Sequence, residues 1–293
     1  MKNIDVKILN PEAAAKSEKL MVCAARLTQR GEKIKTMDDF MALYEKSYTE
    51  ETAQFMAKLP HPTLQKFGAI NIVVVGASRR FLAQITRHQN EVKFMSASLQ
   101  YSNYADEADF VVPYELYEKP ALMKTMYLTQ CKDAMDNYKA AIEQGLDNDA
   151  AGYMAPQGLA NVLIISATPY QWKHMIAQRT CRRNTPETRY VMLRIWELLY
   201  KLSPILFECS APPCCFGDCP EMNMSCGKPI WWTRRHPAQI IQEDFPLLDD
   251  KKHLCSHCSQ DFATCPPGGK EYGNGPGGDN VVKCEQYKTD SGR

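Results

Sequence analysis

Two short aliphatic runs set the fold class of this 293-residue chain. In Ile70–Val75, both alternating faces are mostly apolar, which is typical of a strand inside a sheet. Residues 161–167 (Asn-Val-Leu-Ile-Ile-Ser-Ala) predict a second buried strand. Both runs are far shorter than the roughly 20 apolar residues that a membrane-spanning helix needs. We therefore expect an α+β fold with a small, central, twisted sheet.

The segments around these strands carry helical patterns. Side chains that recur every three or four residues share one helix face, and three such stripes occur. They are Phe81 and Ile85; Leu128, Cys131, Met135, Tyr138 and Ile142; and Val191, Ile195, Leu198 and Leu202. Helix starts are indicated by capping hydroxyls or by proline in the first turn, at Thr36, Thr49, Pro169 and Pro186. Long helices should therefore flank the sheet.

Composition narrows the class of protein further. The chain has 35 basic and 34 acidic residues, a net charge of +1, and 44% apolar residues. This balance argues against a disordered chain and against a whole-protein charge that would attract nucleic acid or membrane surfaces. The first residues contain no apolar segment typical of a secretory signal. We expect a cytoplasmic protein without a membrane partner.

Cysteine is concentrated at one end of the chain, since nine of the twelve cysteines follow residue 208. We therefore expect a regular body over residues 1–207 and an irregular, Cys- and Gly-rich tail over residues 208–293. Without a secretory signal, clustered thiols indicate metal ligands or reduced cysteines before disulfides. Four tail cysteines are spaced as candidate zinc ligands, with unliganded thiols as the alternative: Cys255, Cys258, Cys265 and Cys284. Cys215, Cys219 and Cys226 are candidates for a second knot or for sharing the first.

Two polar segments are candidates for ligand binding. Arg87-His88 leaves a predicted helix and is followed by Ser98-Leu-Gln100-Tyr101. Residues 173–201 contain seven basic side chains that suit the phosphate of RNA, of a cofactor or of a nucleotide. In both cases the alternative is an ordinary solvated surface.

The order and spacing of several motifs resemble the flavin-dependent thymidylate synthase family. The motifs are His61-Pro-Thr63 before the first strand, Arg87-His88-Gln89 at a helix end, Ser98-Leu-Gln100-Tyr101, Arg179 before Glu187-Thr-Arg189, and Cys219-Pro-Glu followed by Cys226-Gly. The resemblance spans roughly residues 15–228. It implies that residues 1–207 form the catalytic body of such an enzyme.

The resemblance also implies a reaction. Members of the family are homotetramers that hold FAD in clefts shared between subunits and convert dUMP to dTMP. Methylenetetrahydrofolate and NADPH are co-substrates, and the reduced flavin transfers the folate carbon and a hydride. No nucleophilic cysteine is needed, so the implied activity is a flavin-dependent methyltransferase.

Family positions transfer to this chain residue by residue. The implied flavin contacts are Thr28, His61, Thr63, Arg87, His88, Gln89 and His174. The implied nucleotide contacts are Gln84, Ser98, Gln100 and Arg179. Arg179 is the implied catalytic residue, because a permanent cation beside the uracil ring stabilises the negative charge that builds up as C5 becomes nucleophilic.

The chain departs from the family at the nucleotide phosphate. Gln100 and Gly152 occupy the two positions where the family has phosphate-binding arginines. One extra residue precedes Ser98, so we expect Lys93 to lie in an inserted loop and to replace them together with Arg182 or Arg183. The alternative is methylation or hydroxymethylation at C5 of another pyrimidine, such as dCMP or a nucleoside.

A different class of protein is also compatible with the pattern. Residues 173–201 and a zinc-binding tail would suit a zinc-containing nucleic-acid-binding protein. The near-neutral net charge and the lack of interleaved surface aromatics argue against it.

Overall fold

A computed structural model describes residues 1, 3–46, 48–248, 270–273 and 280–284. Its centre is an antiparallel four-stranded sheet in the order β1-β2-β4-β3. The strands are β1 (Asp5–Ile8), β2 (Ile70–Ser78), β4 (Ala160–Ala167) and β3 (Val92–Ser96). The two strands predicted from the sequence are β2 and β4. They pair with each other at the centre of the sheet, as predicted for β2, whereas β4, predicted to be buried, is buried on one face only. The α+β prediction is confirmed.

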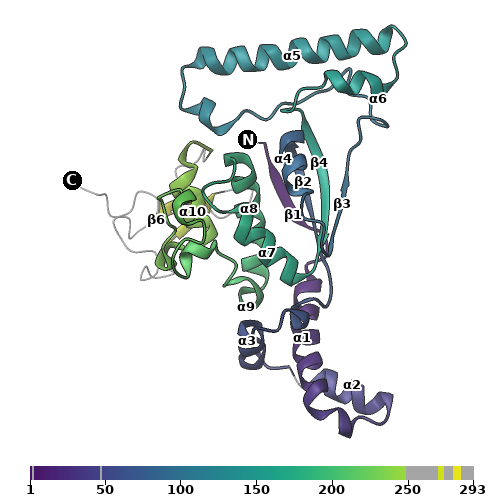
Figure 1. The fold of residues 1–293 in the computed structure, drawn as a ribbon, viewed down its shortest axis with the longest axis vertical. Helices are drawn as coiled ribbons and strands as arrows, with labels where there is room; N and C mark the ends of the chain where they lie inside the picture. Colours follow the sequence, from purple (N-terminus) through teal and green to yellow (C-terminus); the bar gives the residue numbers. More distant parts are fainter. Residues whose placement is uncertain (2, 47, 249–269, 274–279, 285–293) are drawn as a thin grey trace, which may run out of the picture.

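Helices cover one face and both ends of the sheet (Figure 1). They are α1 (Glu12–Arg30), α2 (Met37–Lys46), α3 (Glu50–Lys58), α4 (Arg79–Ile85), α5 (Ala121–Glu143), α6 (Asn148–Ala151), α7 (Pro169–Arg179), α8 (Pro186–Leu202), α9 (Pro204–Phe207) and α10 (Pro237–Asp244). A separate hairpin joins β5 (Lys270–Gly273) to β6 (Asn280–Cys284). No helix in the described ranges is both long and apolar enough to cross a membrane.

The predicted helix starts are confirmed. Thr49 accepts a hydrogen bond from the backbone N–H of Thr52 at 3.2 Å, and Thr36 caps α2 in the same way through Asp39. Pro169 and Pro186 begin α7 and α8, where the missing amide hydrogen costs nothing. The 19-residue α1 was not predicted, because small and polar side chains such as Ala13, Ser17 and Glu18 make up much of its buried face.

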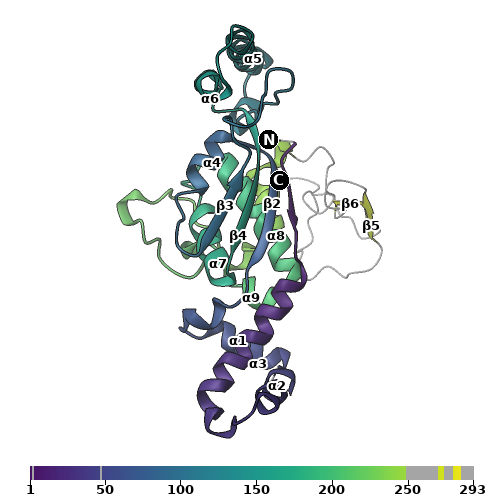
Figure 2. The same cartoon turned by 90° about the vertical axis from the view of Figure 1, so that its right-hand side faces the viewer.

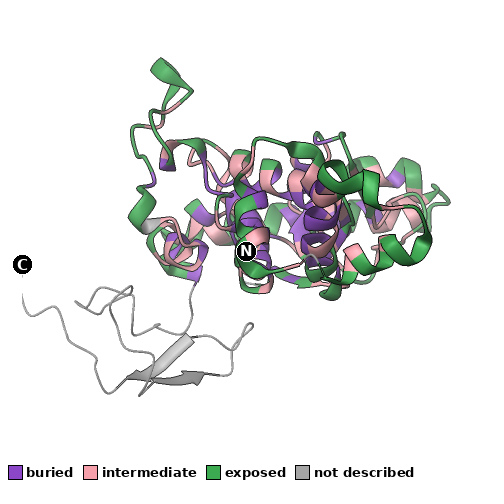
Figure 3. Ribbon diagram, turned by 90° about the horizontal axis from the view of Figure 1, so that it is seen from below, coloured by how far each residue is buried: buried purple, intermediate pink, exposed green. Residues whose placement is uncertain are grey.

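Most side chains of the predicted stripes point into the core, although Leu128, Ile142, Leu198 and Leu202 are only half-buried. Figure 3 shows the buried residues gathered between the sheet and its helices. Phe81 and Ile85 seat α4 on the sheet, and Val191 and Ile195 seat α8. The α5 stripe packs in a smaller cluster of its own around Tyr138. Burial of these stripes, rather than helix propensity, is what stabilises the arrangement.

The two faces of the sheet differ. Ile70, Ile72 and Val74 are fully buried beneath the helices. The opposite face of β2, β4 and β3 carries apolar side chains that are exposed in the single chain: Val75 (44%), Met95 (73%), Val162 (43%) and Ile164 (41%). Figure 2 looks onto this outer face, with α4, α7 and α8 behind the strands. The strands are therefore buried on one face only, which an antiparallel sheet permits.

Residues 208–248 pack against the body instead of forming a separate tail. Ile230, Ile240 and Phe245 belong to the same core as the sheet and α8. Asp244, at the end of α10, accepts bonds from two arginines that follow α7. Arg182 binds it through two nitrogens at 2.9 and 3.1 Å, and the buried Arg189 also pairs with it. The division at residue 207 remains a prediction, but it does not separate two cores.

We expect Asp244→Ala to lower the free energy of unfolding by about 3–5 kcal/mol, because it leaves Arg189 buried without its counter-ion. Burial alone would raise the pKa of Asp244, but the hydrogen bonds and charges of Arg182 and Arg189 hold it below its usual range. This stabilisation is therefore present above about pH 4 and is lost as the pH falls through the folded-state pKa. Urea unfolding at several pH values measures both effects.

The exposed Asp218 offers the matched control. Asp218→Ala should change the free energy of unfolding by no more than about 0.5 kcal/mol. Equal losses in the two variants would show that the Asp244 cluster has no special role.

Candidate functional site

A pocket of about 720 Å³ lies between the segment that follows α4 and one face of α7. Its volume is within the usual range for small-molecule sites. Its lining residues are Lys66, Arg87, His88, Gln89, Asn90, Glu91, Tyr170, Gln171, His174, Gln178 and Arg179. The structure thus brings together five of the residues named from the sequence: Arg87, His88, Gln89, His174 and Arg179.

Helix α7 presents one face to this pocket. Tyr170, His174 and Gln178 are four residues apart, so they lie one above another on the helix. The start of α7 is fixed by Thr168, which accepts a bond from the backbone N–H of Gln171 at 3.3 Å. The opposite face anchors the helix through Trp172, whose indole N–H donates to the carbonyl of Ile70 at 3.0 Å. The pocket wall is therefore rigidly attached to the sheet.

Arg179 is the last residue of α7 and joins three segments. Its Nε donates to His88 Nε2 at 2.8 Å, and one terminal nitrogen donates to the carbonyl of Gln84 at 3.0 Å. Its other terminal nitrogen donates to the Asn184 side-chain oxygen at 3.3 Å. The guanidinium plane is thus fixed by contacts from α4, from the α4–β3 connection and from the α7–α8 turn.

These bonds determine the protonation of His88. Because Nε2 accepts a hydrogen bond, the neutral imidazole carries its proton on Nδ1. Burial, the neighbouring Arg179 and then His174 lower the pKa of His88 to about 4. The His174 ring lies edge-on to the His88 ring, with 5.8 Å between centroids. His88 therefore lines the pocket as a neutral imidazole near pH 7, with its proton on Nδ1.

Arg87 differs from its neighbour. It is exposed, lines the pocket and makes no hydrogen bond or ion pair with any residue in the described part of the chain. Lys66, which also lines the pocket, is paired with Glu91 at 2.7 Å and lies over the Tyr170 ring. Arg87 is thus a cation available to an anionic ligand, whereas the charge of Lys66 is partly neutralised.

Gln84 lies beneath the pocket. Its side-chain oxygen accepts bonds from the Thr185 and Thr188 hydroxyls at 2.9 and 2.5 Å. Nearby, the largely buried Glu187 accepts two bonds of 2.6 Å from Ser78, which caps α4. Both contacts tie the start of α8 to α4. The bonds from Thr185 and Thr188 therefore hold Gln84 in place, and with it the Gln84 backbone carbonyl that accepts the bond from Arg179.

Three predicted flavin contacts do not line this pocket in the single chain. His61 and Thr63 are exposed at the turn η2 (Pro62–Gln65), although Lys66 from the same segment reaches the pocket. Thr28 is exposed near the end of α1, which runs away from the sheet (Figure 1). Their assignment to flavin stays a prediction that requires another subunit.

The predicted nucleotide segment lies beyond β3. The Ser98 hydroxyl accepts a bond from the backbone N–H of Gln100 at 3.1 Å, and Gln100 is exposed. Gly152 lies beside this segment, since a Cβ built on it would be 3.1 Å from the Cβ of Leu99. The two positions where the family has phosphate-binding arginines are therefore close in space, and both are neutral here.

The expected replacement cations are placed differently from the prediction. Lys93 lies within β3, exposed on the outer sheet face and paired with Ser166, so the inserted-loop prediction is wrong. Just before the strand, Glu91 adopts a positive φ of 56°. Arg182 is held by Asp244 and by the carbonyls of Lys228 and Pro229.

The third candidate, Arg183, pairs with Glu221. Other basic residues of the 173–201 segment are also engaged, because Arg194 and Lys201 pair with Glu197, and Lys173 donates to the Gln65 side chain. Most of this segment is therefore internal structure and not a surface for RNA.

The predicted tail metal site cannot be located. Cys255, Cys258 and Cys265 lie outside the described residues, and Cys284 falls in β6. Zinc binding there stays a prediction.

Sequence reasoning missed Asn184, Glu91 and Tyr170. Asn184 and Glu91 act through contacts across loops, which leave no periodic signal. Tyr170 shared the α7 face with the predicted His174 and was detectable by its spacing of four.

An antiparallel sheet with an arginine–histidine pocket beside its helix layer defines an α+β ligand-binding protein. Residues 12–205 match the family model described as "Thymidylate synthase complementing protein", and the chain belongs to that family. The predicted family and the predicted class of enzyme, a flavin-dependent thymidylate synthase-like methyltransferase, are thereby confirmed.

Individual relatives agree with this assignment. The chain is 26% identical over 192 residues to the flavin-dependent thymidylate synthase of Geobacter sulfurreducens, covering 64% of this chain and 81% of the relative. It is 24% identical over 253 residues to the enzyme of the same name from Clostridium tetani, covering 78% and 95%.

Solved structures agree in fold. The chain resembles the UMP/dUMP methylase PolB from Streptomyces cacaoi, bound with 5-Br dUMP, with a TM-score of 0.56, 16% identity, and coverage of 71% of this chain and 94% of that one. It also resembles thymidylate synthase X from Helicobacter pylori, with FAD and dUMP, with a TM-score of 0.52, 15% identity and coverage of 71% and 98%.

We expect nitrogen-15 NMR to show His88 as a neutral imidazole protonated at Nδ1, with a pKa near 4, because burial and Arg179 oppose the imidazolium. In Arg179→Ala the pKa of His88 should rise, since one opposing cation is removed. The exposed His61 supplies a reference signal. A His88 signal that titrates near the ordinary value of about 6.5 in the parent would contradict the geometry.

Proposed function

We propose that the protein transfers a one-carbon unit to C5 of a pyrimidine deoxynucleotide, converting dUMP to dTMP with FAD as cofactor. Methylenetetrahydrofolate is the proposed carbon donor and NADPH the proposed reductant. The observation that carries the proposal is the pocket in which Arg87-His88-Gln89 meets Arg179. The two solved structures described above hold dUMP or its bromo derivative.

The residues present fit a flavin. The pocket, at about 720 Å³, is large enough for a ring system, and it offers a guanidinium at Arg87, a neutral Nδ1–H donor at His88 and amides at Gln89 and Gln178. Such donors suit the carbonyl and nitrogen edge of a flavin ring or its phosphates. When bound, the flavin would supply the redox chemistry and carry the one-carbon unit. His174, on the α7 wall, would pack beside it.

Arg179 would stabilise charge on the pyrimidine. A guanidinium beside the ring favours the form in which negative charge spreads over N3 and O4 and C5 becomes nucleophilic. His88, Gln84 and Asn184 hold this cation in place before substrate binds, so little reorganisation is needed. Burial lowers the pKa of Arg179, and Arg87 adds to this, yet a guanidinium stays protonated at any working pH.

The direct test is an anaerobic assay with purified protein. Reduced flavin is mixed with methylenetetrahydrofolate and one pyrimidine, and its oxidation is followed by absorbance. Omitting NADPH from steady-state turnover tests the reductant. Mass spectrometry of the product distinguishes a methyl from a hydroxymethyl group. Colourless protein that neither binds added FAD nor consumes dUMP would refute the proposal.

We expect Arg179→Ala to lower turnover about 100- to 1,000-fold while FAD still binds, because the cation acts mainly on charge that develops during reaction. Arg179→Lys should recover little, since an ammonium cannot make the three planar bonds. Arg194→Ala, which removes a cation paired with Glu197 on α8, is the matched control. Turnover near the parent level in Arg179→Ala would show that the family position has been assigned wrongly.

A second substrate class is favoured by the neutral phosphate positions. Gly152 leaves no room for a side chain unless Leu99 moves, and Gln100 carries no charge. A dianionic phosphate would therefore lose two charge-assisted bonds, each worth about 1.5–3 kcal/mol. A nucleoside, which has no phosphate, is the alternative that these positions favour. The nucleotide dCMP carries the same phosphate as dUMP and is an alternative at the ring only. Parallel assays with dUMP, dCMP and deoxyuridine decide between them.

We also propose that the active protein is a homotetramer. Thr28, His61 and Thr63 lie away from the pocket of their own chain, and a shared cleft would bring them to the pocket of another. The apolar outer face of the sheet, at Val75, Val162 and Ile164, needs a cover that the single described chain does not provide.

We expect Ile164→Lys to reduce the mass measured by light scattering and to weaken FAD binding, because an unpaired ammonium in a subunit interface costs several kcal/mol. Met37→Lys, at an exposed apolar position on α2, is the control and should leave the mass unchanged. An unaltered tetramer in Ile164→Lys would show that subunits meet elsewhere. A monomeric parent that binds FAD would refute the tetramer.

A further inference from the structure

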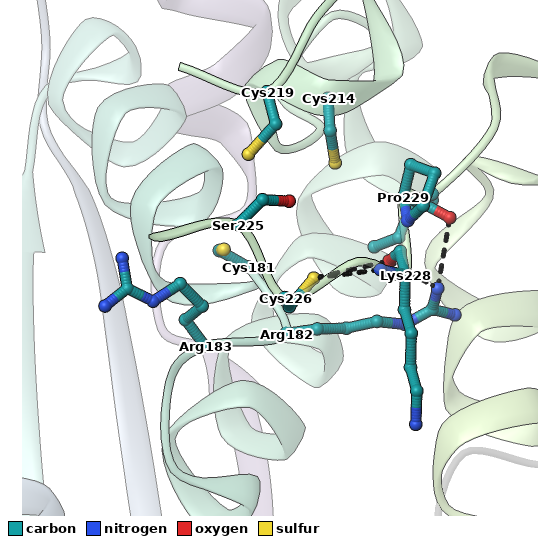
Figure 4. A pocket seen from close by; sticks show the side chains of 10 residues that line it. Cys181, Arg182, Arg183, Cys214, Cys219, Ser225, Cys226, Lys228 and Pro229 are labelled. Carbon is teal, nitrogen blue, oxygen red and sulfur yellow. Dashed lines mark hydrogen bonds between the residues drawn. The ribbon is translucent and has the colours of Figure 1, made fainter. Parts of the chain in front are cut away.

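Four cysteines from three segments converge on a small cavity beside the α7–α8 turn, residues 180–185, which we call the catalytic turn because it follows Arg179 (Figure 4). Cys181 lies two residues beyond Arg179, Cys214 lies in η5 (Pro213–Cys215), and Cys219 and Cys226 flank η6 (Met222–Met224). The cavity has a volume of about 20 Å³, which is room for one ion and not for an iron–sulfur cluster. All four thiols are free.

The loop that carries two of these cysteines has no apolar anchor. Between residues 216 and 229 every side chain is exposed except Cys219 and Cys226, which are half-buried. Even Met222 and Met224 point to solvent, with 81% and 63% of their surface exposed. Because this loop exposes its methionines and half-buries its cysteines, we infer that contacts of the thiols, and not apolar packing, determine its path.

The turn at Cys226 brings both backbone groups of Lys228 to the sulfur. The backbone N–H of Lys228 donates to the Cys226 sulfur at 3.4 Å, and the protonated thiol donates to the Lys228 carbonyl at 3.5 Å. Gly227 has a φ of 67°, a conformation that side chains rarely adopt, and this bends the chain back onto the sulfur. An amide hydrogen bond favours the charged form of its acceptor. Such second-layer bonds are typical around metal-bound thiolates.

We propose that Cys181, Cys214, Cys219 and Cys226 bind one structural Zn²⁺. Four thiolates around one point are the usual donor set of structural zinc. Arg182, Arg183 and Lys228 line the same cavity and would offset part of the negative charge of a zinc tetrathiolate, although Asp244 and Glu221 already pair with the two arginines. Within the described residues no three ligands are yet arranged around a single metal position, so binding must draw the exposed loop inward.

The zinc site would stabilise the catalytic turn, an extension that rests on the proposed function. The carbonyl of Cys181 accepts bonds from the Asn184 backbone N–H at 3.0 Å and from its side chain at 3.3 Å. Asn184 in turn accepts from Arg179. A metal bound to Cys181 would therefore restrict Asn184, the residue that accepts a hydrogen bond from the Arg179 guanidinium.

The test measures metal in the full chain purified without chelator. Cys219→Ser/Cys226→Ser should lose about one zinc per chain relative to the parent, because serine oxygen is a poor replacement for a thiolate. Cys209→Ser, an exposed thiol outside the cavity, is the matched control and should lose none. Cys255→Ser/Cys258→Ser removes two candidate zinc ligands of the tail, and this variant should keep the zinc of the cavity.

A second measurement leaves all four cysteines of the cavity unchanged. In the Cys255→Ser/Cys258→Ser background, Co²⁺ added to metal-free protein should give the intense visible bands and sulfur charge-transfer absorption of a tetrahedral thiolate site. Protease should then cut the 216–229 loop at least about tenfold more slowly than in the metal-free form, since metal binding supplies folding free energy.

Three results would overturn the proposal: no zinc in the parent, zinc lost only from the tail variant, or iron with acid-labile sulfide in place of zinc. None of these readouts depends on turnover, so failure of the zinc site and failure of the proposed reaction are distinguishable. For the extension, a loss of turnover in Cys181→Ser with FAD binding unchanged supports coupling to Arg179. Parent-like turnover in zinc-free protein would contradict it.

Discussion

The Arg179 side chain is the contact on which the candidate site depends. It is the last residue of α7, and it bonds at once to His88, to the Gln84 carbonyl and to Asn184. Together with the bond from Thr185 to Gln84, these contacts link the end of α4 to the α7–α8 turn. The same bonds fix the His88 tautomer, and the cation helps to keep that imidazole neutral. One residue thus sets the shape and the charge of the pocket wall.

Much of this was predictable from the chain. The central strands, the caps at Thr36 and Thr49 and the inward stripes depend on local periodicity and local hydrogen bonds, which sequence records directly. The grouping of Arg87, His88, His174 and Arg179 was predictable only through motif order, since these residues come from distant segments. Asn184 and Glu91 were missed because their roles come from loop contacts.

The wrong prediction has the same origin. Lys93 was assigned to an inserted loop by counting residues between motifs, but pairing with Ser166 keeps it in β3. Similarly, the basic appearance of residues 173–201 concealed ion pairs to Asp244 and Glu197, which lie on α10 and α8. Charge in a sequence is visible, whereas its tertiary partner is not. Motif spacing therefore predicts neighbourhood better than it predicts orientation.

The two neutral phosphate positions and the Arg179 pocket belong to different segments of the chain. Gln100 and Gly152 lie together, so their loss of charge acts at one place and leaves the Arg179 pocket intact. In the proposed reaction, charge stabilisation on the ring and phosphate recognition would involve different segments and different contacts. A change of charge at Gln100 and Gly152 is therefore compatible with the same chemistry at C5 and a different group at the far end of the substrate.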